Sequence, residues 1–175
     1  MIPIELVFFL LVIMFGFVGL VRGFLKELGV TTVMAVVLFA LYFFDHKMMP
    51  MLGKVSARLA PGQAGADQLQ TAVYVLALIG IAYISYQGQT LAFAGTEPKG
   101  PIGVFLKLTI GLVDGYLIVG SIWYYLDRLG YPVLHITQAQ LSSTARWLLE
   151  VSPPSLLGPY LLYVAVFLVI FRVIK

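Results

Sequence analysis

Long apolar runs without charges constrain this chain more than any other feature. A helix that crosses a bilayer needs roughly 17–25 such residues. With 61% hydrophobic and 11% charged residues among 175, and a mean hydropathy of +0.98, the chain is too apolar for a soluble enzyme or a nucleic-acid-binding protein. We therefore predict an all-α membrane bundle that forms a single domain. The expected spans are residues 4–21, 28–44, 69–93, 104–126 and 156–174.

Two connecting segments carry helical patterns of their own. In residues 47–59 apolar side chains recur on one helical face, and in residues 138–151 a similar stripe follows a Thr137-x-x-Gln140 capping box. Both segments are too short and too charged to span a membrane. We expect two amphipathic helices lying at the membrane surface. Packing against the end of the bundle is the alternative.

The basic residues give a weak orientation signal. With the N-terminus outside, six basic residues lie inside and five outside. Short loops influence orientation more than long ones, and the short loop with Arg22 and Lys26 would then be inside. We therefore predict an N-out, C-in topology.

The residues that commonly carry membrane chemistry are missing or misplaced. The chain has no Cys, which excludes iron–sulfur and thiolate metal sites. Its two histidines, His46 and His135, lie in connecting segments, whereas a haem within a bundle needs a histidine inside a span. The stretch 95–100 has the glycine spacing of a phosphate loop but lacks its Lys-Ser or Lys-Thr. We expect no enzymatic activity, no cofactor and no metal site.

Two short glycine motifs resemble one another. Gly19 and Gly23 close the first span, and Gly111 and Gly115 lie in the fourth, each pair with the spacing Gly-x-x-x-Gly. This spacing bares one helix face and lets another helix approach closely. We expect these faces to join helices, either within the chain or to a second copy or another membrane protein. Spans one and four would run antiparallel, as in an inverted repeat.

Asp114 is the ionisable residue placed within a predicted span. Such a residue is costly in a membrane and is by default a functional hypothesis with a partner to be named. Arg22 is our candidate partner in a buried ion pair, with Lys26 and Lys107 as rivals. The alternative is a proton or ion path, which polar residues of the third span would have to extend. These are Tyr83, Ser85, Tyr86, Gln87 and Gln89.

The sequence Gly19-x-x-Arg22-Gly23-Phe24-x-x-Glu27-Leu28 resembles the colicin V production protein (CvpA) family of small bacterial inner-membrane proteins. The resemblance covers residues 1–44, and 100–126 more loosely; Asp114 stands where that family usually has a second Arg. It implies an envelope-maintenance role linked to secretion, and it carries Arg22, Gly23 and Glu27 over as motif residues.

From these observations we predict a non-enzymatic, CvpA-like membrane scaffold with the bilayer and other membrane proteins, or further copies of itself, as partners. The first alternative is an accessory subunit of a respiratory or photosynthetic complex without a cofactor of its own. The second is a small channel or transporter that uses Asp114.

Overall fold

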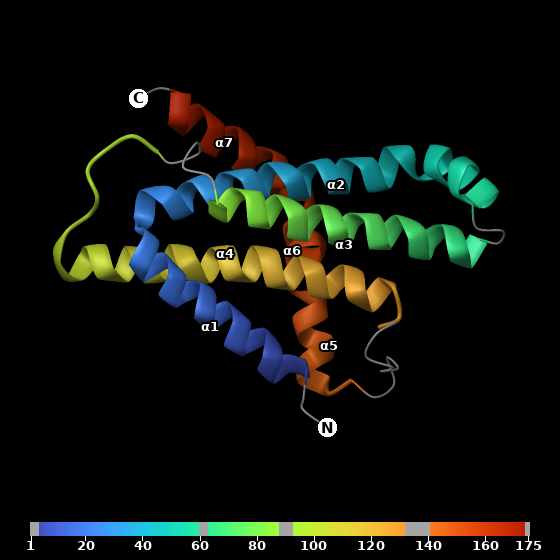
Figure 1. Cartoon of the computed structure of the whole chain (residues 1–175), viewed down its shortest axis with the longest axis horizontal. Coiled ribbons are helices and arrows are strands. Elements are labelled where there is room, and N and C mark those ends of the chain that lie inside the picture. The colour runs from blue at the N-terminus through green and yellow to red at the C-terminus, as the bar shows by residue number, and fades with distance from the viewer. Residues whose placement is uncertain (1–3, 60–62, 88–92, 132–140, 174–175) are drawn as a thin grey trace.

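The computed structural model describes residues 4–59, 63–87, 93–131 and 141–173, with the backbone alone for 45–59, 63–68 and 70. Within these ranges the chain is mostly helical and has no strand (Figure 1). This confirms the predicted all-α class. The elements are α1 (Ile4–Arg22), α2 (Phe24–Leu59), α3 (Gln63–Gln87), α4 (Gly100–Arg128), α5 (Ser143–Glu150), α6 (Pro153–Leu156), η2 (Gly158–Tyr160) and α7 (Leu161–Val173).

Three stretches of the described chain are long and apolar enough to cross a membrane, namely Ile4–Arg22, Phe24–Phe44 and Gly100–Arg128. Two shorter apolar helical stretches, Thr71–Gln87 and Gly158–Val173, accompany them. By length and composition, these helices are suited to a membrane-embedded bundle. The predicted count of five spans is not established by these lengths.

The bounds of both predicted amphipathic helices differ from the structure. The segment 47–59 continues α2 without a break, so it is not a separate helix. The drop in hydropathy after Phe44 marks the end of the apolar stretch, and the helix continues through it. The amphipathic helix predicted at 138–151 begins later, where the Ser142 side chain accepts a hydrogen bond of 3.0 Å from the Ala145 amide. Thr137 and Gln140 lie outside the described residues.

α4 is the central element of the bundle, because it packs against α1, α2 and α3 (Figure 1). Helices α2, α3 and α4 share one apolar core, to which the start of α7 adds Leu161. Among its most deeply buried residues are Met34, Leu38, Leu78 and Leu117. α7 covers the other side of α2 through Ala165 and Leu168.

A second core joins α5 to the crossing of α1 and α4. Phe8 and Trp123 meet there, and the Trp123 indole donates a hydrogen bond of 2.7 Å to the Tyr131 hydroxyl. The Tyr116 hydroxyl also donates to the Val151 carbonyl at the end of α5. These contacts hold the short helix α5 against α1 and α4.

Glycines allow α1 and α4 to touch backbone to backbone. A Cβ added at Gly111 would lie 2.5 Å from the carbonyl oxygen of Phe15 and 3.0 Å from the Cα of Gly19. A Cβ added at Gly115 would lie 2.8 Å from the Cβ atom of Phe15. α1 contributes Gly16 and Gly19 to this contact, and Gly23 lies beyond its end. The expected antiparallel crossing of these helices is therefore present within the chain (Figure 1).

We predict that Gly111→Ala destabilises the protein by about 1–3 kcal/mol, because backbone atoms of α1 occupy the space of the new methyl group. The matched control is Gly80→Ala in α3, where no atom lies within 4 Å of the added Cβ. We expect that control to be neutral or stabilised by up to about 1 kcal/mol, as alanine favours helix over glycine. Thermal unfolding of both variants in detergent, followed by circular dichroism, makes the comparison. Equal effects would show that the crossing is not tight.

Candidate functional site

The joint between α1 and α2 is one residue long. Gly23 has φ +97°, in the left-handed region that favours glycine, and its amide donates to the Gly19 carbonyl at 3.0 Å. An added Cβ there would lie 2.7 Å from a Glu97 carboxylate oxygen. Gly23 is thus required both for the sharp reversal of the chain and for the approach of Glu97.

Glu97 caps the start of α2 from a distant part of the chain. Its two carboxylate oxygens accept hydrogen bonds from the amides of Phe24 (3.1 Å) and Leu25 (3.2 Å). These amides have no partner within the helix, and negative charge is favoured at a helix N-terminus. Lys107 of α4 lies 3.6 Å from the same carboxylate. The segment before α4 is therefore tied to the joint of α1 and α2.

Arg22 connects this joint to the end of α3. Its guanidinium forms an ion pair of 2.8 Å with Glu27, the first acidic residue of α2. It also donates to the carbonyl oxygens of Tyr86 (3.3 Å) and Ser85 (3.5 Å), in the last turn of α3, and lies 4.4 Å from the Tyr86 ring centre. A cation at the C-terminal end of a helix is favourable and satisfies carbonyls that lack a helical partner.

Glu27 is fully buried, and both of its carboxylate oxygens have a partner. One oxygen accepts from Arg22, and the other accepts a hydrogen bond of 2.9 Å from the Tyr86 hydroxyl. Three helices meet at this carboxylate. A charge buried in this way is tolerated because it is paired and hydrogen-bonded.

Asp114 is also fully buried and lies beside the Glu27 carboxyl group, but only one of its oxygens receives a hydrogen bond from a hydroxyl group. The Thr31 hydroxyl of α2 lies 2.6 Å from Oδ1, and Oδ2 has no hydrogen-bond partner. The predicted ion pair with Arg22 is not formed, since the guanidinium is engaged by Glu27 and the end of α3. The rival Lys107 pairs with Glu97 instead. The rival Lys26 is exposed.

The structure thus gathers Arg22, Glu27, Thr31, Tyr86 and Asp114 from all four long helices, a set that we call the polar cluster. Sequence reasoning named Arg22, Glu27 and Asp114, and named Tyr86 only as a possible lining residue of a path. It missed Thr31 and Glu97. Thr31 lies one helical turn after Glu27, so i,i+4 spacing from a motif residue was the available signal for it.

Other polar residues proposed for a path point elsewhere. Gln87 donates to the Tyr83 hydroxyl at 2.6 Å on the exposed surface. The Ser85 hydroxyl donates to the Ile81 carbonyl of its own helix. Gln89 lies outside the described residues. In the described part of the chain, no group of three or more His, Cys, Asp or Glu side chains could hold a metal ion.

The chain matches no protein-family model, no curated protein and no solved structure. The resemblance to the CvpA family stays a prediction that rests on the residues from Gly19 to Leu28.

We predict that Glu27→Gln destabilises the protein by about 3–5 kcal/mol, because it leaves the Arg22 charge buried without its counter-ion. The matched control is Glu150→Gln, an exposed position on α5, for which we expect a change within about 0.5 kcal/mol. Urea or thermal unfolding in detergent provides the measurement. If the two variants unfold alike, the ion pair does not hold the helices together.

We predict that Gly23→Ala is more damaging than Gly130→Ala. Both glycines have positive φ (+97° and +71°), so each substitution strains the backbone by about 1–2 kcal/mol. At Gly130 nothing lies within 4 Å of the added Cβ, whereas at Gly23 the methyl group displaces the Glu97 cap. A lost cap adds about 0.5–2 kcal/mol. The difference between the unfolding midpoints of the two variants measures the stabilisation by the Glu97 cap. Equal midpoints would show that the cap does not stabilise the protein.

Proposed function

We propose that this protein is a non-enzymatic, CvpA-like scaffold of a bacterial inner membrane, with five spans in an N-out, C-in arrangement. Its task is to hold a helical platform in the bilayer for envelope maintenance or secretion.

The observation that carries this proposal is the role of the motif residues. Gly19 lies in the glycine crossing of α1 and α4, Arg22 and Glu27 join α1, α2 and α3, and Gly23 forms the joint that receives Glu97. Each of these contacts holds helices in place. The residues that give the chain its family resemblance therefore make contacts that hold helices together, which favours a structural role as a scaffold.

The fourth and fifth crossings are inferred from the two shorter apolar stretches. Thr71–Gln87 lies within α3, which packs on α2 and α4, and Gly158–Val173 packs on α2. Because α2 itself is long enough to span, helices laid along its apolar part are suited to cross the same bilayer.

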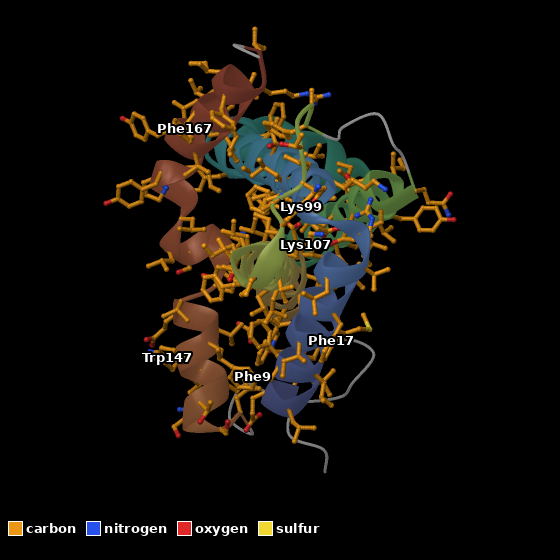
Figure 2. All side chains as sticks on the ribbon, turned by 90° about the vertical axis from the view of Figure 1, so that its left-hand side faces the viewer. Phe9, Phe17, Lys99, Lys107, Trp147 and Phe167 are labelled. Atoms are coloured by element: carbon orange, nitrogen blue, oxygen red, sulfur yellow. The ribbon has the colours of Figure 1, made fainter. Side chains whose placement is uncertain are left out.

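The outer faces of the bundle suit lipid or a partner protein. Phe17 on α1 and Phe167 on α7 are 61% and 66% exposed, and Figure 2 shows Phe167 and Trp147 projecting away from the bundle. The glycine faces of α1 and α4 already pack against each other. A second copy or a larger complex would therefore be bound through the outward faces, as in the accessory-subunit alternative.

A channel or transporter remains the second candidate, favoured by one observation, the unpartnered Oδ2 of Asp114 inside the bundle. Proteoliposomes with a pH-sensitive dye test it: proton flux that is lost in Asp114→Asn would support conduction over a scaffold.

We predict that gentle detergent extraction from native membranes gives a homo-oligomer or monomer with lipid attached, measured as the mass of the intact complex. The reason is that the polar cluster and both apolar cores are built from residues of one chain. A matched extraction of the Glu27→Gln variant should yield less folded protein. A large assembly with fixed partner stoichiometry would contradict the self-contained scaffold and favour the accessory subunit.

A further inference from the structure

The two buried carboxyls of the polar cluster have very different surroundings. Glu27 has a cation and a hydroxyl group, one for each oxygen. Asp114 has the Thr31 hydroxyl at 2.6 Å from Oδ1 and, as its other polar neighbour, the carboxyl group of Glu27, and its completely buried Oδ2 receives no hydrogen bond from a hydroxyl or N–H group. An ionised carboxylate offers about four acceptor positions. The surroundings therefore meet the needs of an anion at Glu27 and fail to meet them at Asp114.

Charge balance leads to the same distinction. The charged and titratable groups around Asp114 are Arg22 of α1, Glu27 of α2 and Tyr86 of α3. Arg22 and Glu27 neutralise each other, and the Tyr86 hydroxyl donates a hydrogen bond to Glu27. A negative charge on Asp114 would then be uncompensated inside a membrane protein, where a buried carboxyl group takes up a proton instead.

Thr31 fits a protonated neighbour. Its hydroxyl oxygen lies 2.6 Å from Asp114 Oδ1 and 3.1 Å from the Glu27 carbonyl oxygen, yet a hydroxyl has one proton to donate. If Asp114 donates to Thr31 and Thr31 donates to the carbonyl, each contact has a proton of its own, whereas an ionised Asp114 would have to share the single Thr31 proton with the carbonyl.

We propose that Asp114 is a buried proton-binding site, whose carboxyl group is protonated at neutral pH and exchanges its proton with the side of the membrane where Arg22 lies. The Arg22 side chain is 20% exposed and pairs with Glu27, whose carboxyl group in turn interacts with Asp114. In the other direction along α4 the interior is closed by Leu78, Leu117 and Ile118. The polar contacts of Asp114 thus lie toward one side of the bundle only, which suits binding and release of a proton on that side.

Release of this proton would place a second carboxylate beside Glu27 without a second cation. The two carboxylates, Glu27 on α2 and Asp114 on α4, would repel each other in the low-dielectric interior. This repulsion would act on the contact between α2 and α4 that Thr31 and Asp114 form. Proton binding at Asp114 thereby couples the packing of α2 against α4 to the pH on one side of the membrane.

Infrared difference spectroscopy of the full chain in nanodiscs tests the proposal. We expect the wild type at pH 7 to show the carbonyl stretch of a protonated carboxylic acid, shifted in D₂O, and weakening as the pH is raised. This band should be lost in Asp114→Asn and retained in the matched control Glu97→Gln, a partly exposed carboxylate paired with Lys107. A wild-type spectrum at pH 7 that lacks the band would overturn the proposal.

A second variant guards against misfolding of Asp114→Asn. Thr31→Val keeps Asp114 and removes its hydrogen-bond partner, so the carbonyl band should persist at a shifted frequency. An unshifted band would mean that the band arises from another group.

A second measurement asks whether the site binds a proton or a sodium ion. The choline in the buffer is replaced by Na⁺ at constant ionic strength and pH. An unchanged band is expected, and loss of the band on adding Na⁺ would make this a cation site in place of a proton site.

Discussion

The ion pair between Arg22 and Glu27 is the interaction on which the rest of the bundle depends. The two residues belong to different helices, separated by the one-residue joint at Gly23, and the pair forms because the chain reverses there. Arg22 has more donors than Glu27 needs, and it uses the others on the carbonyls that end α3. A single guanidinium thus fixes the angle between α1 and α2 and the position of α3. In a bilayer, where exposed backbone groups cannot turn to water, this use of donors is especially valuable.

The glycine crossing and the polar cluster are two consequences of the same placement of α4. Gly111 and Gly115 bring one side of α4 onto the backbone of α1, and Asp114, between them in the sequence, points from another side toward Thr31 of α2. Close contact with α1 needs small residues, since lipid gives no hydrophobic drive for helices to associate. Attachment to α2 uses a polar contact instead. The central helix is therefore held on neighbouring sides by two different kinds of interaction.

Hydropathy and spacing predicted the parts of this structure that depend on neighbouring residues in the sequence. The all-α class, the apolar stretches and the approach of α1 to α4 follow from local patterns. The pairing of Thr31 with Asp114, which joins residues 83 positions apart on different helices, could not be predicted in that way. Arg22 and Glu27 are five residues apart across a turn, so helical spacing does not pair them, and Glu97 reaches α2 from more than 70 residues away. Long-range capping of this kind needs the tertiary arrangement.

The distribution of polar groups makes the two ends of the described bundle unequal. At the Arg22 end, two helix termini are capped by side chains from other elements, and two carboxyls are buried. Toward the other end, the interior becomes the apolar core around Leu38 and Leu78, which tolerates little besides close packing. A change of charge at the polar end alters contacts of α2 with α1, α3 and α4, whereas the apolar core has no charged group through which to respond. The bundle is therefore suited to stay fixed around the apolar core of Leu38 and Leu78, while its packing at the Arg22 end depends on charge.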